Sequence, residues 1–388
     1  MKNIQRLFYC GLYMLFSAAC KEAYQAPVKN ADLNYLVIEG YINSNGGVTK
    51  IMLSRTARLT QTTITREKNA QLTIESDANE SFPMSEAGDG TYLSQSLTLA
   101  NTAKYRLRIK TKDGKEYLSD FTAVKSTPPI DSINWVRQAD GVQLHINTHD
   151  PQNNTKYYYW NYEETWEFHS TYTNSLVYVV NPDTHEQIAV TYKYPDSHDI
   201  DTTIYKCWKT VNSTDILIGS SEKLSEDKIF LPLLFIPQGS EKISVLYSVR
   251  LNQIAVSKEA YQFLQKMKKN TEQLGSIFDA QPTELKGNIH CISNPDELVI
   301  GFVEVSQQQD KRIFISNREL PRWDYNSGCD KIDITNNKDS IAKYAGGRLP
   351  SVPSETRGSD IIVSFFASAA ECIDCTVKGT NVKPDFWP

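Results

Sequence analysis

The sequence predicts a mostly β protein made of tandem β-sandwiches, and three observations support this prediction. The balance of Thr, Tyr, Val and Ile against helix-forming residues favours sheets. Short apolar–polar alternating stretches recur between turn residues about every 8–12 positions, as in β-sandwiches. Only one segment has a convincing helical pattern. With 388 residues, the chain has material for two or three domains.

Residues 1–19 are predicted to be a signal peptide. Lys2 and Arg6 form a basic start, a short apolar run follows, and Ser-Ala-Ala at 17–19 is a small-residue cleavage site before Cys20. The apolar run is shorter than the ~20 residues that a membrane-spanning helix needs. We therefore expect a lipoprotein signal with acyl chains on Cys20. A plain secretory signal would share the charged and apolar parts, and Ser17 stands where lipoprotein signals commonly carry Leu.

The net charge is −5, with 41 basic and 46 acidic residues. Removal of residues 1–19 takes away two basic residues and no acidic ones, so the mature chain would carry −7. This balance argues against nucleic acid or an anionic bilayer surface as the main partner. The membrane contact that we expect is the lipid on Cys20.

The first sandwich is expected over residues 31–127, after a lipid-anchored tether at 20–30. Residues 33–42 and 48–56 flank a Ser-Asn-Gly-Gly turn, which indicates a hairpin. Further alternating segments bring the total to six or seven short strands, the pattern of an immunoglobulin-like sandwich. Ser-Thr-Pro-Pro at 126–129 marks the domain boundary, because two prolines cannot feed a central strand.

The second domain, residues 128–388, is expected to be a β-rich, fibronectin-III-like domain with one amphipathic helix and long loops. Its entry, Pro-Pro-Ile-Asp-Ser-Ile-Asn-Trp-Val, resembles that of fibronectin-III-like domains. Residues 170–227 are rich in Asn, Asp, Ser and Thr and are expected to form a surface loop, where binding concentrates. The helix is predicted at about 258–274, with Ser257 as N-cap, and should cover an open face or edge of a sheet.

An aromatic block at residues 157–168 is the most distinctive feature of the second domain. Alternation places one apolar set on a single face and predicts that this face is core; its members are Tyr158, Trp160, Tyr162, Trp166 and Phe168, interrupted by Glu164. The alternative is an exposed aromatic row that stacks on sugar rings. The candidate ligand contacts are Tyr157, Tyr159 and Trp166.

Five cysteines remain beyond Cys20, namely Cys207, Cys291, Cys329, Cys372 and Cys375. In an exported protein they predict disulfides, with one cysteine left over. Cys372 and Cys375 form a CxxC, which follows a strand and is therefore unlike a redox motif at a helix start. Each is expected to pair with a distant cysteine, such as Cys329, or with the other.

No catalytic residues, metal site or cofactor are predicted. His145 and His149 would lie ~13 Å apart on a strand and could not share one ion without a bend. Acidic loops around Asp199 and Asp330 could hold calcium, but neither has EF-hand spacing, and solvated turns are the simpler interpretation. A nucleophile-elbow motif, a P-loop and a dinucleotide-binding motif are absent from the sequence.

Two runs resemble a known family. Residues 257–289 (SKEAYQFLQKMKKNTEQLG and onward) are followed by NPDELVIGFVEVS, and the chain closes with CIDCTVKGTNVKPDFWP. Together they resemble a family of Bacteroidota lipoproteins known as domain of unknown function 4249.

The resemblance implies an outer-membrane lipoprotein, often found beside TonB-dependent transporters, with no established catalytic residues. Glu22 close behind Cys20 resembles the acidic signals that send such lipoproteins to the cell surface. We therefore expect a non-enzymatic accessory or substrate-capturing subunit of a nutrient transporter. The alternatives are a stand-alone glycan- or peptide-binding surface protein, or a hydrolase whose site is assembled from distant residues.

Overall fold

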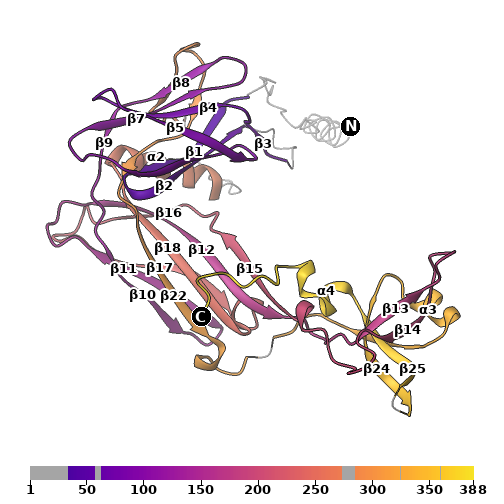
Figure 1. The fold of residues 1–388 in the computed structure, drawn as a ribbon. Helices are drawn as coiled ribbons and strands as arrows, with labels where there is room; N and C mark the ends of the chain where they lie inside the picture. Colours follow the sequence, from indigo (N-terminus) through magenta and orange to yellow (C-terminus); the bar gives the residue numbers. More distant parts are fainter. Residues whose placement is uncertain (1–33, 57–62, 273–284, 324, 359) are drawn as a thin grey trace, which may run out of the picture.

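The computed structural model describes residues 34–56, 63–272, 285–323, 325–358 and 360–388. It confirms the mostly β fold class. Three β-rich bodies follow one another in space, here called the first, second and third domains (Figure 1). Each has its own cluster of buried apolar side chains. Among the described residues, no helix is long and apolar enough to cross a membrane.

The first domain is one long sheet that folds back on itself. Its strands in chain order are β1 (Leu36–Asn43), β2 (Asn45–Arg55), β3 (Thr65–Arg66), β4 (Gln71–Ser76), β5 (Ser81–Gly88), β6 (Thr91–Thr98), β7 (Lys104–Lys110), β8 (Glu116–Ser119) and β9 (Thr122–Ala123). The first half of β5 pairs with β4 and the second half with β6, so β5 passes from one layer to the other. Side chains from both layers, such as Ile51 and Leu107, share the core.

Three later strands complete this sheet. They are β19 (Ile289–Cys291), β20 (Val299–Ile300) and β21 (Val305–Ser306); β19 pairs with β8, and the other two pair in parallel with β1. The predicted boundary assigned residues 289–306 to the second domain, whereas the structure places these strands in the first. The physical reason is that open sheet edges at β1 and β8 need partners, and local sequence patterns do not indicate where those partners come from.

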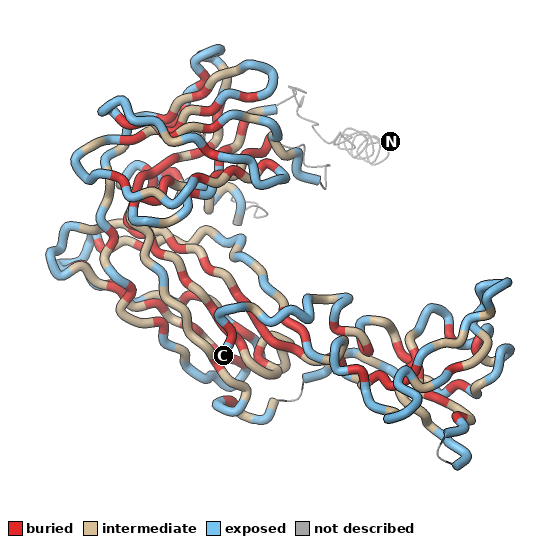
Figure 2. The backbone as a smooth tube through the Cα atoms, in the orientation of Figure 1, coloured by how far each residue is buried: buried red, intermediate tan, exposed pale blue. Residues whose placement is uncertain are grey.

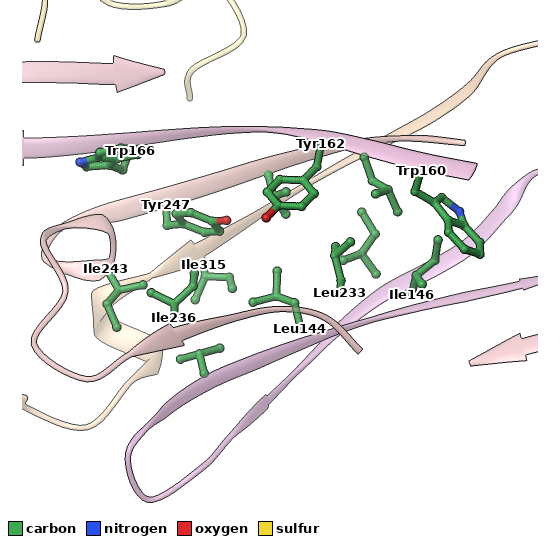
Figure 3. Packing of buried hydrophobic residues seen from close by; sticks show 14 of the residues in the cluster. Leu144, Ile146, Trp160, Tyr162, Trp166, Leu233, Ile236, Ile243, Tyr247 and Ile315 are labelled. Carbon is green, nitrogen blue, oxygen red and sulfur yellow. The ribbon is translucent and has the colours of Figure 1, made fainter. Parts of the chain in front are cut away.

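The second domain is a sandwich of two antiparallel sheets. One sheet consists of β10 (Ile130–Arg137), β11 (Gly141–His149) and β17 (Lys228–Pro237), in that order. The other has the order β15 (Lys206–Asn212), β12 (Tyr157–His169), β18 (Leu246–Ala255) and β22 (Gln309–Ser316), with β16 (Leu217–Ser220) also on β12. Leu144, Trp160 and Tyr247 are among the side chains that fill the space between the sheets (Figure 3).

Glu164, which interrupts the apolar face of β12, is buried in the second domain and fully paired. Lys242 Nζ lies 2.7 Å from its Oε2 and 2.8 Å from its Oε1, and the Tyr247 hydroxyl donates to Oε1 at 2.8 Å. Lys242 belongs to the short 3-10 helix η2 (Glu241–Ile243). The carboxylate is tolerated among apolar residues because a cation and a hydroxyl satisfy it.

The third domain combines two distant segments. Strands β13 (Leu176–Val180) and β14 (Gln187–Tyr192) form one sheet, and β23 (Lys331–Thr335), β24 (Leu349–Arg357) and β25 (Ile361–Ser368) form another, with helix α3 (Lys338–Tyr344) alongside. The prediction of a surface loop over 170–227 is wrong, because this segment contains β13, β14, β15 and β16 and the short helix η1 (Thr202–Ile204). The Asn, Asp, Ser and Thr content of the whole segment hides two apolar runs, at 176–180 and 187–192, which flank an Asn-Pro-Asp turn and pack against residues far away in the chain.

Helix α2 (Lys258–Glu272) begins where the sequence predicts. The Ser257 hydroxyl accepts a hydrogen bond from the Ala260 N–H at 3.0 Å, the ordinary N-cap contact. Its predicted end at about residue 274 lies outside the described residues. Buried Ala260 and Phe263 belong to its inner side. The remaining short helices are η3 (Asn317–Glu319), α4 (Ala370–Ile373) and η4 (Cys375–Val377).

Candidate functional site

Trp166, one of the three predicted ligand contacts, is a core residue. Its side chain is 5 % exposed, and its indole N–H lies 3.4 Å from Glu241 Oε2. Tyr158, Trp160, Tyr162 and Phe168 are buried with it, which confirms the predicted core face of β12. A ring in this position cannot stack on a ligand, so the predicted platform fails at Trp166.

Tyr157 and Tyr159, the other two candidates, lie on the opposite face of β12 and are half-buried at a junction. They pack against a small cluster formed by Ile254, Val256 and Ala260, together with Tyr41 and Phe302 of the first domain. The Tyr157 ring lies 5.2 Å from that of Tyr261 on α2. Helix α2 therefore covers this end of the sheet, as the sequence predicts, and the tyrosines hold domains together.

The other end of the same outer face is covered by the C-terminal segment (Figures 1 and 2). Trp387 is 5 % exposed, donates its indole N–H to Glu167 Oε2 at 3.2 Å and meets the Phe314 ring edge-on at 5.5 Å. The Arg312 guanidinium lies 3.6 Å from the centre of the Phe386 ring. We call this outer face of β15–β12–β18–β22 the covered face.

Two disulfides secure the C-terminal segment. Cys375 pairs with Cys207 on β15, and Cys372 pairs with Cys329, while Cys291 is buried and unpaired. Both CxxC cysteines thus pair with distant partners, one of the two arrangements that the sequence left open. The predicted lipidation site, Cys20, lies outside the described residues.

The outer face of the other sheet is different. Phe230 is 60 % exposed, Phe235 is 40 % exposed and Val136 is 52 % exposed. The His145 ring stacks on Phe230, with ring centres 4.9 Å apart and planes within 8° of parallel. His145 Nδ1 is buried and has no hydrogen-bond partner in the described part of the chain, so stacking holds this ring. We call this outer face of β10–β11–β17 the open face.

A β-bulge brings the two phenylalanines to the same side. Phe230 and Phe235 are five positions apart, and strict alternation would put them on opposite faces. On β17, however, Leu234 pairs with Leu144 and Pro232 pairs with His145, so Leu233 is an extra residue. Leu233 and Leu234 both pack into the core. The bulge thereby reverses the register, which turns Phe235 outward.

Uncharged polar side chains accompany these rings. Cross-strand pairing sets Gln143 between Val136 and Phe235, and His145 between Asn134 and Pro232; Asn147 lies opposite Phe230. The Gln143 amide donates to the carbonyls of Leu144 and Leu234 at 2.9 and 3.0 Å, which holds the bulge. Gly141 leaves room for the Phe235 ring, because a Cβ atom there would lie 2.5 Å from Cζ of that ring.

A second feature is a charged hollow of about 790 Å³ in the first domain. Arg55 Nε contacts Glu67 at 2.6 Å; Glu297 accepts from Lys115 at 2.6 Å and from the Tyr117 hydroxyl at 2.7 Å. Burial alone would raise the pKa of the Glu297 carboxyl, but the hydrogen bonds from Lys115 and Tyr117 outweigh burial and lower that pKa. The charges neutralise one another, so this network works as a junction that holds the returning segment.

The candidate cation loops do not form a metal cluster. Within the described ranges, no group of three or more His, Cys, Asp or Glu side chains is placed to hold a metal ion. Asp201 is buried and accepts from the Thr203 N–H at 2.9 Å, while Asp324 lies outside the described residues. His149 pairs with Asp131 at 2.7 Å instead of meeting His145.

The open face was missed by sequence reasoning. The stretch KIFLPLLFIP at 228–237 reads as a strand, but its alternation alone separates Phe230 from Phe235. The available signal was the consecutive pair Leu233-Leu234 beside a proline, because adjacent core-type residues can mark a bulge.

Fold and surface together define a modular β-sandwich protein with one ring-bearing open sheet face. The chain belongs to the family described as domain of unknown function 4249, whose sequence model matches residues 21–312. The match stops before β23, so the C-terminal CxxC and the closing Phe-Trp-Pro lie beyond it. No curated protein matches the chain in sequence.

Similarities to solved structures are weak. A chitinase from Bacillus thuringiensis has 13 % identity and a TM-score of 0.16, with 55 % of this chain and 30 % of the chitinase chain covered. A structure described as manganese lipoxygenase of Gaeumannomyces graminis with a partial zonadhesin of Komagataella pastoris has 9 % identity and a TM-score of 0.17, with 59 % and 91 % covered. This chain thus spans less than a third of the chitinase. We draw no functional argument from scores at this level.

Proposed function

We propose that this protein is an outer-membrane lipoprotein, anchored through Cys20 and exposed on the cell surface, that captures a ligand for a neighbouring TonB-dependent transporter. The observation that carries the capturing role is the open face. Exposed aromatic residues grouped with uncharged polar side chains are characteristic of recognition surfaces. The same sandwich covers its other outer face, so exposure of the rings is not a general property of the domain.

The anchor and the transporter have separate support. The basic start, the apolar run and the Ser-Ala-Ala-Cys junction support lipidation of Cys20. Family membership supports the location beside a transporter through the resemblance described above. We propose a binding role without catalysis, and a stand-alone binding protein is the second candidate, since it would use the same open face.

The test begins with the anchor. Cells expressing Cys20→Ala should lose metabolic palmitate labelling of the protein and release it from the membrane fraction. Cys10→Ala is the matched control, because Cys10 lies within the segment predicted to be removed. A Cys20→Ala protein that stays in the outer membrane would contradict lipid anchoring.

The partner is tested by purifying the tagged protein from gently solubilised outer membranes. A TonB-dependent barrel recovered in stoichiometric amount supports the transporter role. Recovery of the protein alone, under conditions that keep a known lipoprotein–barrel pair intact, would overturn that role and favour a stand-alone binder.

A further inference from the structure

We infer that the open face binds a neutral glycan chain, with the rings of Phe230 and Phe235 stacking on sugar rings and the amides beside them bonding to hydroxyl groups. This inference rests on the proposed capturing role and names the class of ligand. The observation that supports it is that the two exposed rings lie on the same face of the sheet as the side chains of Asn134, Gln143 and Asn147.

Charge on the face selects the class of ligand. Three cross-strand rows form the centre of this face, and none contains an Asp, Glu, Lys or Arg side chain. They are the rows centred on Gln143, His145 and Asn147 of β11. Asp131, at the start of β10, is paired with His149 at 2.7 Å. An anionic or cationic partner would have no opposite charge to meet at the centre of this face. A polyhydroxylated neutral ligand matches the amides of Asn134 and Asn147, which can both donate and accept hydrogen bonds. Gln143, whose N–H groups bond to the Leu144 and Leu234 carbonyls, offers its oxygen as an acceptor.

Spacing favours a chain over a single sugar. The row that contains Phe235 and the row that contains Phe230 are separated by four residues along β11, from Gln143 to Asn147. At ~3.3 Å per residue this is ~13 Å. One monosaccharide cannot contact both rings, whereas an oligosaccharide lying along the strands can.

The edge of the sheet argues against a peptide that binds by strand addition. β10 and β17 are the two edge strands of this sheet. At the start of β10 the Ile130 and Asp131 carbonyls already accept from Lys311 Nζ, so β17 would be the template for such a peptide. Pro232 and Pro237 lie in this strand and lack the N–H groups that pairing requires. The side-chain face of the sheet is therefore the better recognition surface.

The experiment uses the full mature protein in detergent, run on native gels that contain laminarin, xyloglucan, dextran or levan. Polygalacturonate is the charged comparison, and a tryptic digest of casein, titrated by calorimetry, tests peptides. We expect retardation by at least one neutral polysaccharide, and a loss of about tenfold or more in affinity for Phe230→Ala with Phe235→Ala, because buried aromatic anchors dominate binding.

Two further variants separate a glycan from a merely apolar ligand. Asn134→Ala with Asn147→Ala leaves the rings in place and should weaken polysaccharide binding several-fold, because the hydroxyl groups lose their amide partners. Binding of an apolar ligand would not depend on these amides. Tyr344→Ala removes an exposed ring of the third domain, 48 % exposed, and should leave binding unchanged.

The inference is overturned if no neutral polysaccharide retards the protein, or if retardation survives loss of both phenylalanines. Casein peptides bound by the wild type and lost in the double phenylalanine variant would also overturn it, while leaving the capturing role intact. Polysaccharide binding without a co-purifying barrel would support the inference and overturn only the transporter role.

Discussion

The covered face and the open face of the second domain differ in how far their aromatic side chains are exposed to solvent. Both carry aromatic side chains on the outside of an antiparallel sheet. On the covered face, Tyr157 and Tyr159 are packed beneath α2 and the first domain, and the C-terminal Trp387 closes the other end. On the open face, Phe230 and Phe235 have no comparable cover among the described residues and remain 60 % and 40 % exposed.

The two faces differ in how many segments of the chain cover them. Segments from three parts of the sequence converge on the covered face, and a disulfide ties one of them to β15. On the open face, Val136, Phe230 and Phe235 remain 52 %, 60 % and 40 % exposed within the described part of the chain. Burying aromatic surface stabilises folding by about 25 cal/mol per Å², so leaving rings exposed forgoes stability. This loss of stability accords with the binding role proposed above.

The largest expected effect concerns the disulfide that secures the covering segment. Cys207 and Cys375 are 168 residues apart. Removing a disulfide that closes a loop of this length should lower the free energy of unfolding by about 4–5 kcal/mol. The test is urea unfolding of Cys207→Ser with Cys375→Ser. The matched comparison is Cys329→Ser with Cys372→Ser. The disulfide removed there joins residues 43 positions apart, so its loss should lower the free energy of unfolding by about 1 kcal/mol less. Equal stability of wild type and the first variant would contradict the role of this bond.

Trp387→Ala should give the next largest effect. The side chain is buried, and truncation of a buried Trp costs about 3–5 kcal/mol. Glu167 would also lose its indole donor. Phe386→Ala, at a ring that is 40 % exposed, should cost markedly less in the same denaturation experiment. If the free energy of unfolding of Trp387→Ala lies within about 1 kcal/mol of the wild-type value, the C-terminal segment does not stabilise the covered face.

The junction end of the covered face should respond to pH. Glu304 accepts hydrogen bonds from the Ser257 N–H at 3.0 Å and from the Ser257 hydroxyl, and its Oε2 is buried without a partner among the described residues. Burial raises its pKa, an effect that Ser257 and the nearby Lys125 only partly offset. A raised carboxyl pKa favours folding while the group is protonated, so this contribution is present below pH 4.5 and is lost as pH rises through the folded pKa.

Glu304→Gln should therefore be more stable than wild type at pH 8, and the difference should shrink towards pH 4. Unfolding free energies measured across this range test the prediction. Glu355→Gln, at an exposed carboxylate of the third domain, is the control. A difference that is the same at both pH values would refute a titrating Glu304.

The smallest stability effect is expected on the open face. Phe230→Ala should lower the free energy of unfolding by no more than about 1 kcal/mol, because the ring is 60 % exposed and its loss removes mainly the stacking on His145. Thermal unfolding of this variant beside Trp387→Ala gives the direct contrast between the two faces. A loss above about 1.5 kcal/mol would mean that Phe230 belongs to the structural core and that the open face is not free for a ligand.

Local patterns predicted what depends on local physics. Alternation identified Tyr158, Trp160 and their neighbours as core, because a half-buried strand repeats every two residues. Ser257 identified the start of α2, since N-capping involves residues three positions apart. The odd cysteine count predicted one cysteine without a partner, which the structure identifies as Cys291.

Long-range choices were not readable. The runs LVYVV at 176–180 and QIAVTY at 187–192 flank an Asn-Pro-Asp turn, so a hairpin was readable there. Its packing against β23–β25, more than 130 positions away, was not. The open face depended on one extra residue, Leu233, which changes which side Phe235 occupies. A register shift of this kind leaves composition unchanged, and its signal in the sequence is only the adjacent pair Leu233-Leu234 beside Pro232.

The return of residues 289–306 to the first sheet also determines when that sheet can be finished. Because the chain is synthesised from its N-terminus, β1 and β8 must wait until more than 160 further residues have been made before β19, β20 and β21 are available. Contacts this distant slow folding, because the intervening loop must close before they form. Two strand edges stay open in the meantime, and open edges invite aggregation. Newly made chains should therefore depend on chaperones until residue 306 is available.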